Sequence, residues 1–508
     1  MTQLHPRRWW ALGALAVSLL TVGLDLTVLN VAVPTLAVDL GATTTQLQWF
    51  GNAYTLALAA LLLPAGLLGD RFGPKKLLLG ALALFGLASL GCAYSGSPGE
   101  LIAARVVLGV GAAFLIPLSL SLLNILFPPE ERAKALTTWV LATFAGIPLG
   151  PLLGGWLLDH FAWGSVFLIN VPLTVAGLVA VLFLIPLTPG SGRGAIDFAG
   201  IALSAAGLVA LTYGFVYAGE QGWADPATYG LIALGLALLA VFCWAQTRTA
   251  SPLTDLALFR EPRFVWGAVL ATMASFALMG LLFVLPQLFQ AVQGADALQT
   301  GVRLLPLIGG MLVSAKIAER LVTAVGVRVV VTAGFAVLAA GLAWGSTTAP
   351  SDGYGFTVAW ASVIGLGTGC TLPPLMSMAM GALTEGRSGA GSALIQVLRQ
   401  VGGTIGVAVL GTVLNGVYRH GVAVDGLPAP VADAVRGSAS AAVAVAEKLH
   451  RPALGESARL AFTDGMAATL GVCAGLGVAG ALLALLFLPG RTAPRAQPRE
   501  SAHDVVAG

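Results

Sequence analysis

Apolar stretches long enough to cross a lipid bilayer occupy most of this chain and restrict the folds that it can adopt. A transmembrane helix needs about 20 predominantly apolar residues. Hydrophobic residues make up 57% of the chain and charged residues 10%, whereas soluble domains carry about 25% charged residues. We therefore expect an all-α integral membrane protein with fourteen spans, at 9–34, 48–68, 77–95, 101–126, 135–158, 165–187, 197–218, 228–247, 264–289, 298–318, 327–347, 354–382, 390–417 and 465–488.

The distribution of positive charge predicts the orientation of these spans. The first stretch follows Arg7 and Arg8 as a signal peptide would, but it is too long for one, so we expect a retained helix. With the N-terminus in the cytoplasm, most of the 26 Lys and Arg residues fall in cytoplasmic segments, and the outer ones gather in segment 419–464. Both termini are therefore predicted to lie in the cytoplasm, with the chain in the cytoplasmic membrane.

Several classes of function lack their signals in this sequence. A net charge of +3 is too small to indicate a nucleic-acid partner. The sequence has no phosphate-binding G-x-x-x-x-G-K-[ST] loop, so ATP hydrolysis by this chain is not expected. No histidine falls within a predicted span, which argues against a histidine metal cluster and most histidine catalysis. The four cysteines form no C-x-x-C pair and lie in apolar stretches, which favours buried packing over disulfides or metal binding. We expect no cofactor and no metal.

An internal repeat divides the predicted spans into two groups. "GVGAAFLIPL" at 109–118 resembles "GLGTGCTLPP" at 365–374, with glycines and a proline at matching positions, and "GDRFG" at 69–73 has a weaker echo in "AERLV" at 318–322. We expect a six-helix bundle at 1–187, a two-helix insertion and linker at 188–263, a second bundle at 264–488 and a tail at 489–508. Two such halves around a cavity are typical of transporters. The insertion is interpreted as lipid-exposed filler, and segment 419–464 is assigned no role beyond a short helix near 430–449.

A charged loop follows the second span, in "GLLGDRFGPKKLL" from Gly66 to Leu78. Gly73 suits a tight turn. Asp70 can pair with Arg71 or cap the N-terminus of a facing helix. Lys75 and Lys76 are also typical of an ordinary positively charged cytoplasmic loop. The specific role of Asp70 and the ordinary loop both stay open.

"GIPLGPLLGG" at 146–155 places four glycines and two prolines inside a helical stretch. Gly146, Gly150 and Gly154 lie four residues apart and therefore share one helix face, with Gly155 beside them. Small residues let helices approach closely in lipid, and Pro151 removes a backbone hydrogen bond and permits a bend. Ordinary close packing alone would also explain this face.

Asp25 is the acidic residue that lies well inside a predicted span, about 13 Å from the outer end at 1.5 Å per residue. Charges at such depth are costly and usually functional. A proton carrier and a structural salt-bridge partner are both consistent with it, and Arg105 is the candidate partner. Arg303 and Arg399 also lie within spans, so a cavity built for dications is not favoured.

A substrate cavity would need an amphipathic lining. Aromatic, polar and charged side chains within the spans are candidates, although aromatic residues in such helices also face lipid or the core. The candidate lining residues are Asn30, Trp49, Phe50, Tyr54, Trp139, Phe144 and Arg399.

The chain resembles the major facilitator superfamily, specifically its fourteen-helix drug:proton antiporters. The loop matches G-x-L-x-D-R-x-G-x-K, "LDLTVLNVAVP" at 24–34 matches L-D-x-T-V-x-N-V-A-x-P, and "GIPLGPLLGG" matches G-x-x-x-G-P-x-x-G-G. "WGSVFLINVP" at 163–172 and "RVVLGVGAA" at 105–113 depart from the family patterns at Ser165 and Leu108. The resemblance implies that the glycine helix packs between the halves, favours export and limits leakage, and that Asp70 caps the thirteenth helix near Arg387 and Ser388.

The function expected from these features is proton-coupled export of small amphipathic drugs or antibiotics by a monomer in the lipid bilayer, driven by the proton gradient. One alternative is export of a dedicated neutral or anionic metabolite, which the intramembrane arginines favour. Another is a proton-translocating subunit of a respiratory complex, although the expected intramembrane Lys, Glu or His relays are absent. A membrane-embedded enzyme is not expected.

Overall fold

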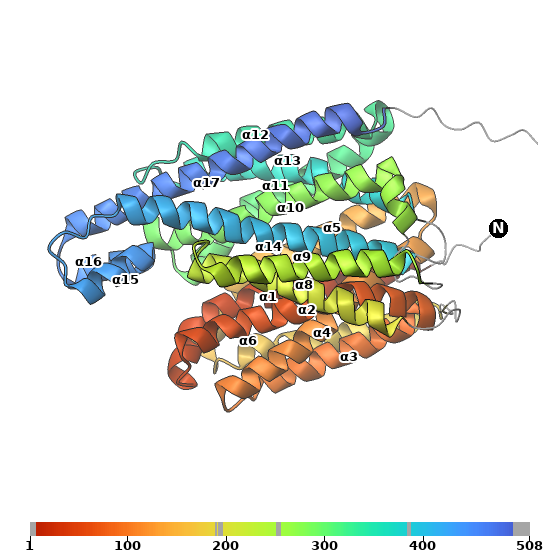
Figure 1. The fold of residues 1–508 in the computed structure, drawn as a ribbon, viewed down its shortest axis with the longest axis horizontal. Coiled ribbons are helices and arrows are strands. Elements are labelled where there is room, and N and C mark those ends of the chain that lie inside the picture. The colour runs from red at the N-terminus through yellow and green to blue at the C-terminus, as the bar shows by residue number, and fades with distance from the viewer. Residues whose placement is uncertain (1–6, 188–189, 191–196, 250–255, 384–387, 491–508) are drawn as a thin grey trace, which may run out of the picture.

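The computed structural model describes residues 7–187, 190, 197–249, 256–383 and 388–490, and within these ranges the chain is helical with no strand (Figure 1). The described part contains 14 helices long and apolar enough to cross a membrane. The predicted all-α class and the predicted number of spans are therefore confirmed.

The spans form two sets separated by a helix pair. The N-terminal set comprises α1 (Arg8–Asp39), α2 (Thr44–Phe72), α3 (Pro74–Ala93), α4 (Pro98–Leu126), α5 (Pro129–His160), α6 (Ser165–Leu168) and α7 (Asn170–Leu184). The helix pair is α8 (Phe198–Gln221) and α9 (Pro226–Gln246). The C-terminal set comprises α10 (Pro262–Gln287), α11 (Ala297–Val325), α12 (Val327–Gly345), α13 (Tyr354–Met380), α14 (Ser388–Gly421) and α17 (Pro452–Phe487). Four shorter elements complete the chain: η1 (Leu256–Arg260), η2 (Leu288–Val292), α15 (Ala429–Gly437) and α16 (Ala439–Lys448).

Capping residues explain where several spans begin. The Thr43 hydroxyl accepts a hydrogen bond from the backbone nitrogen of Gln46, and Gln46 Oε1 accepts one from the backbone nitrogen of Thr43, so the two residues form a capping box at the start of α2. At the start of α4, the side chain of Ser97 accepts a hydrogen bond from the backbone nitrogen of Glu100. Gly73 joins α2 to α3 with a φ of 97°, a conformation that favours glycine, as the sequence predicts for a tight turn.

The same pattern of helix pairing occurs in both sets. In the N-terminal set, α1 packs on α5, α4 packs on α2 and α3, and α3 packs on α7. In the C-terminal set, α10 packs on α14, α13 packs on α11 and α12, and α12 packs on α17. The matched proline motifs of the internal repeat lie in α4 and α13, which occupy equivalent places in this pattern.

The last span begins earlier than the sequence predicts. Helix α17 starts at Pro452 rather than near residue 465, and two short helices, α15 and α16, replace the one expected near 430–449. Polar residues in the first turns of α17 lower the local hydropathy, so hydropathy places the start of the span too late. Asp464 therefore lies inside a span, contrary to the expectation that Asp25 is the one acidic residue there, but Asp464 is exposed.

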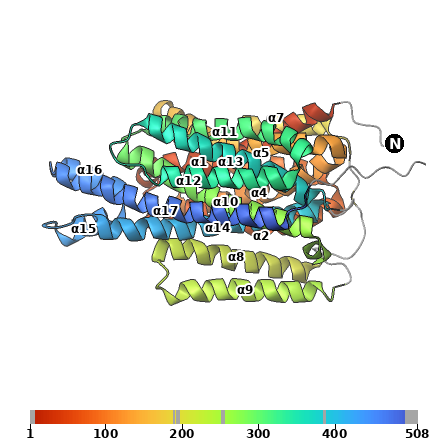
Figure 2. The same cartoon turned by 90° about the horizontal axis from the view of Figure 1, so that it is seen from above.

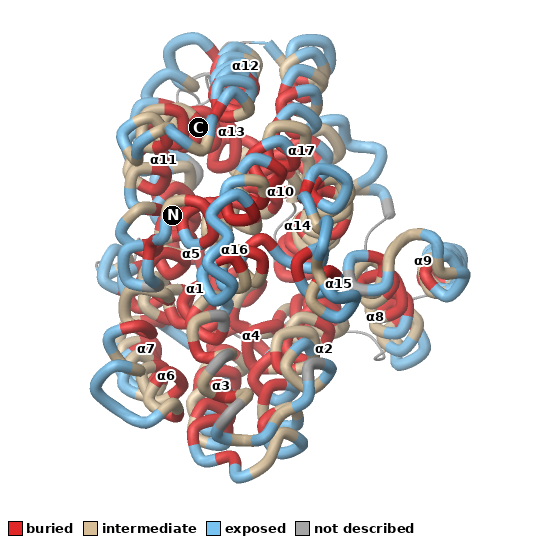
Figure 3. Tube along the Cα trace, turned by 90° about the vertical axis from the view of Figure 1, so that its left-hand side faces the viewer, coloured by how far each residue is buried: buried red, intermediate tan, exposed pale blue. Residues whose placement is uncertain are grey.

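Helix α8 is not the lipid-exposed filler that the sequence analysis expects. It packs against α2 of the N-terminal set and α14 of the C-terminal set, while α9 lies on its outer side (Figures 2 and 3). The indole Nε1 of Trp223 donates a hydrogen bond of 2.8 Å to the hydroxyl of Thr412 on α14. Hydropathy alone does not distinguish a helix that faces lipid from one that faces other helices, which explains the error.

Candidate functional site

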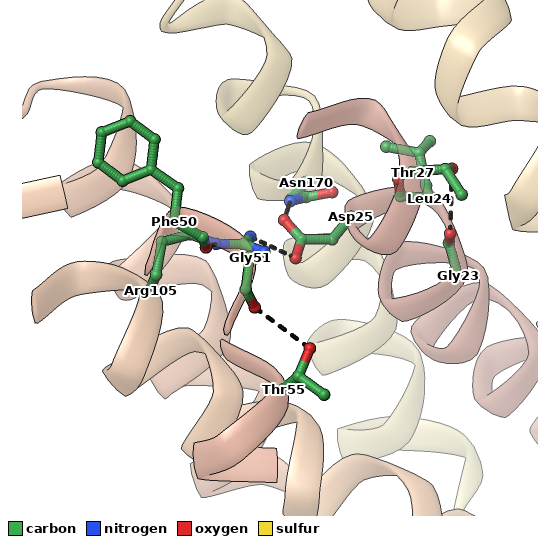
Figure 4. Close-up of polar contacts among 9 residues, drawn as sticks. All are labelled: Gly23, Leu24, Asp25, Thr27, Phe50, Gly51, Thr55, Arg105 and Asn170. Carbon is green, nitrogen blue, oxygen red and sulfur yellow. Dashed lines mark hydrogen bonds and ion pairs between the residues drawn. The ribbon is translucent and has the colours of Figure 1, made fainter. Parts of the chain in front are cut away.

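A buried ion pair joins α1 to α4. Arg105 Nη1 lies 2.7 Å from Asp25 Oδ2, and the two side chains are 2% and 0% exposed, respectively. The second carboxylate oxygen, Oδ1, accepts a 3.3 Å hydrogen bond from Asn170 Nδ2 at the start of α7 (Figure 4). The contact that the sequence left open is thus present, and Asn170 is a partner that sequence reasoning missed.

The guanidinium of Arg105 is held from several sides. Its Nε donates to the backbone oxygen of Phe50 over 2.8 Å. The guanidinium carbon lies 4.6 Å from the ring centroid of Tyr54 and 6.0 Å from that of Phe167, distances at which a cation interacts favourably with an aromatic face. Removing either partner would leave an uncompensated buried charge, which is strongly unfavourable. Asp25 and Arg105 therefore stabilise each other in this buried environment.

A cavity of about 540 Å³ lies between the two sets, within the range of about 300–1,000 Å³ typical of drug-sized ligand sites. Helices α1, α2, α4, α5, α8, α10 and α14 contribute to its wall. The lining residues include Val22, Gly23, Leu26, Asn52, Thr55, Trp139, Phe144, Phe215, Ser275, Met279, Phe283, Gln396, Arg399, Gln400, Thr404 and Asn415.

The structure separates the predicted lining residues. Trp139, Phe144 and Arg399 line the cavity. Trp49 instead packs against Tyr213 of α8, with ring centroids 5.8 Å apart, and Tyr54 is fully buried against Arg105. Phe50 is likewise fully buried and outside the lining. The prediction is therefore wrong for Trp49, Phe50 and Tyr54, because an aromatic residue in a helix packs equally well on a neighbouring helix. Asn30 belongs to α1, but its side chain lies outside the described part of the structure.

The cavity and the ion pair share one helix. Val22, Gly23 and Leu26 of α1 line the cavity, whereas the adjacent Asp25 is fully buried toward Arg105 and Asn170. Three residues of α8 also belong to the wall, and no sequence signal pointed to them: Phe215, Val216 and Gly219. A change in the position of α1 therefore affects both the cavity and the carboxylate.

The glycine face of α5 packs on α1, while the helix as a whole also packs on α11 and α13 of the C-terminal set, as the family resemblance implies. A Cβ atom at Gly146 would lie 2.6 Å from the backbone nitrogen of Leu24, and one at Gly150 would lie 2.9 Å from the Cβ of Thr27. A Cβ at Gly154 would lie 2.8 Å from Val28 Cγ2.

Other residues of α5 meet the C-terminal set. A Cβ at Gly301 of α11 would lie 2.9 Å from the backbone oxygen of Pro148 and 3.0 Å from the nitrogen of Leu152. Pro151 is half-buried in the same helix, and Gly155 is buried. Leu152 is thus a half-buried contact between the sets.

The charged loop brings α2 of one set against α14 of the other. The carboxylate of Asp70 accepts hydrogen bonds from the backbone nitrogens of Gly389 at 2.9 Å and Ala390 at 3.0 Å. A Cβ at Gly389 would lie 2.6 Å from the backbone oxygen of Gly66, so the two helices nearly touch. Asp70 therefore caps α14, one of the two roles left open by the sequence. Arg387 and the side chain of Ser388 lie outside the described residues.

The basic residues of this loop occupy different environments. Lys75 is buried, and its ammonium donates to the backbone oxygens of Leu182 at 2.8 Å and Ile185 at 2.6 Å, at the end of α7. Lys76 is exposed. The guanidinium of Arg71 lies 5.6 Å from the ring centroid of Phe72. Lys75 thus fastens α3 to α7, a role that loop composition does not reveal.

Side-chain volume at Gly150 should grade the stability of the α1–α5 contact. Thr27 donates a 3.0 Å hydrogen bond to the backbone oxygen of Ile147 across this contact, and any added side chain meets Thr27. We expect Gly150→Ala, Gly150→Ser and Gly150→Leu to lower stability progressively, with the leucine variant losing about 1–3 kcal/mol, as overpacking does. Thermal unfolding in detergent measures the series.

The matched control for this series is Gly471 of α17. This glycine is exposed, and a Cβ added to it would meet no atom within 4 Å. Gly471→Leu should therefore leave the melting temperature nearly unchanged. Melting temperatures at position 150 that do not depend on side-chain size would contradict the close-packed contact.

Comparison with known proteins shows the family of this chain. Residues 15–407 match the Major Facilitator Superfamily. The chain is 33% identical to the tetracenomycin C resistance and export protein of Streptomyces glaucescens, over 95% of this chain and 92% of that one. It is also 33% identical to the multidrug efflux pump LfrA of Mycolicibacterium smegmatis, over 94% of this chain and 96% of that one.

A solved structure shares the fold. The human organic anion transporter MFSD10 aligns with a TM-score of 0.64 at 14% identity, covering 95% of this chain and 100% of that one. At this identity the likeness concerns the fold alone. The motifs, the helix pairing and these relatives agree with a transporter rather than an enzyme, and this chain belongs to the Major Facilitator Superfamily.

Proposed function

We propose that the chain is a proton-coupled antiporter that exports small amphipathic drugs or antibiotics by alternating access. The names of its relatives, which include an antibiotic export protein and a multidrug efflux pump, support the drug substrate. The observation that carries proton coupling is the buried Asp25–Arg105 pair on the helix that also lines the cavity. A deep intramembrane carboxylate marks proton pathways in many transporters.

Protonation of Asp25 is the step that links the two fluxes. A proton on the carboxylate removes its charge and weakens the attraction to Arg105, which still holds the Phe50 carbonyl. Helices α1 and α4 are then free to shift relative to each other. Because Val22, Gly23 and Leu26 of α1 line the cavity, this shift alters the wall and releases the substrate. Loss of the proton to the cytoplasm restores the pair.

Asp70 holds the two sets together at one end of the cavity. The sets move as two bundles, and both termini lie in the cytoplasm, so the α2–α14 contact lies on the cytoplasmic side. The cap on Gly389 and Ala390 stabilises the outward-facing arrangement and must break when the cavity opens inward. The carboxylate and the positive end of the helix dipole supply the attraction. The protein works as a monomer in the cytoplasmic membrane.

Asp25→Asn should abolish proton-driven efflux and leave the protein in the membrane, because asparagine has no titratable proton. Drug susceptibility of cells with and without the gene, and efflux in vesicles with an imposed proton gradient, are the measurements. Asp464→Asn is the matched control, since Asp464 is an exposed carboxylate in α17 and its loss should change nothing. Wild-type efflux by Asp25→Asn at equal membrane amounts would overturn the coupling role, and unchanged susceptibility in every strain would overturn drug export.

Asp70→Asn should slow turnover more than it weakens substrate binding. The variant keeps an oxygen that can accept a hydrogen bond but loses the negative charge at the N-terminus of α14, an interaction worth about 0.3–1 kcal/mol, and it does not touch the cavity. Substrate dissociation constants and efflux rates at saturation separate the two effects. Asp352→Asn provides the comparison, because Asp352 also accepts a backbone hydrogen bond, from Ala349 at 2.8 Å, in an exposed loop. Weaker binding with unchanged turnover would show that the assigned role is wrong.

A further inference from the structure

The cavity wall carries an unbalanced positive charge. Arg399 is the one charged side chain among the described residues that line it. Its position in α14 is about 16 Å from the first residue of the helix at 1.5 Å per residue. A charge at that depth is costly to retain and usually serves a function.

The contacts of Arg399 are all with neutral groups. Its Nε donates to Ser275 Oγ at 3.1 Å, and its Nη1 donates to Gln396 Oε1 at 2.8 Å and contacts Met376 Sδ at 3.8 Å. The described residues contain two ion pairs, Arg8–Glu131 and Arg105–Asp25, and neither involves Arg399. The guanidinium charge is therefore not neutralised by any carboxylate in the described part of the chain.

The neighbouring carboxylate does not offset this charge. Asp25 lies on a helix of the cavity wall, but it is fully buried and bonded to Arg105 and Asn170. The pair is neutral as a unit, so a bound molecule experiences mainly Arg399. In a site of low dielectric, one uncompensated charge attracts an anion and repels a cation strongly.

The rest of the wall suits an aromatic or apolar body. Trp139 and Phe144 of α5 and Phe215 of α8 supply aromatic surface, and Gln400 and Thr404 offer hydrogen bonds near Arg399. Arginine presents donors in a planar fork that matches carboxylates and similar anions. Charge and shape together describe a molecule with a ring system at one end and an anionic group at the other.

We infer that the cavity takes amphipathic anions, with a carboxylate, sulfonate or ionised phenol paired with Arg399, and that it disfavours cationic drugs. This inference rests on the proposed function, because it names the substrate class of the same export site. Repulsion by Arg399 excludes dications in particular, which carry twice the unfavourable charge.

Two dyes with a shared xanthene ring system test the inference: fluorescein, an anion in mildly alkaline buffer, and tetramethylrhodamine methyl ester, a cation. Fluorescence anisotropy with the full-length chain in detergent gives their dissociation constants. Fluorescein should bind at least about tenfold more tightly than the cation, a difference typical of one charge-assisted contact. Equal or tighter binding of the cation overturns the inference, as does binding of neither dye.

Arg399→Gln should weaken fluorescein binding by about tenfold or more and leave binding of the cation unchanged or stronger. Arg399→Lys should retain part of the preference, because the charge remains and the fork is lost. Arg303→Gln is the matched control, since Arg303 of α11 bonds Gln293 at 2.9 Å and lies outside the cavity lining. Melting temperatures verify that each variant is folded. Unchanged fluorescein binding by folded Arg399→Gln overturns the inference.

The transport assay separates this inference from the proposed function. Proton-driven export of the cation without export of fluorescein would overturn the anion preference and leave drug export standing. Absence of proton-driven export for fluorescein, the cation and every antibiotic in the susceptibility assay would overturn the proposed function itself.

Discussion

The buried contact between Asp25 and Arg105 is the interaction on which the rest of the structure depends. Removing two charges from water is costly, and a buried pair persists only where further hydrogen bonds satisfy it. Here Asn170, the Phe50 carbonyl and the ring of Tyr54 supply those contacts. These groups come from α1, α2, α4 and α7, so the pair ties together most of the N-terminal set, and a proton on Asp25 changes the balance at its centre.

Close helix packing connects the Asp25–Arg105 pair to the shape of the cavity. The glycines of α5 bring α1 so near that Thr27 donates to the backbone oxygen of Ile147. One face of α1 thus lies on α5, another holds the carboxylate, and a third lines the cavity. Because α1 is a rigid helix, a shift that changes one of these three faces also moves the other two. Arg399 on α14 also lines the cavity, and it gives the cavity a charge that is independent of the Asp25–Arg105 pair.

Hydropathy and motif spacing predicted a large part of this arrangement. The span number, the pairing candidates Asp25 and Arg105 and three lining residues followed from them, because depth and charge leave few options in lipid. The capping role of Asp70 was one of two that the residues left open, and the family resemblance supplied its partner. Hydropathy and motif spacing did not predict which helix packs against each face of a given helix. The position of α8 in the cavity wall, Asn170 beside Asp25 and the contact of Gly150 with α1 depend on which helices meet in space. Hydropathy contains no information on that choice, and polar turns concealed the start of α17.

The central claim is that Asp25 takes up and releases the transported proton, and that its protonation disfavours substrate binding through the shift of α1. Infrared difference spectroscopy of the chain in lipid tests it most directly, because a protonated buried carboxyl has its own carbonyl band. The measurement uses the chain with Asp70→Asn, which removes the other partly buried carboxylate, the one that caps α14. Acidification should produce such a band, addition of an exported compound at the same pH should remove it, and the band should be absent when Asp25→Asn is added but present when Asp464→Asn is added. A band that persists in Asp25→Asn, or that does not respond to the exported compound, would contradict the account.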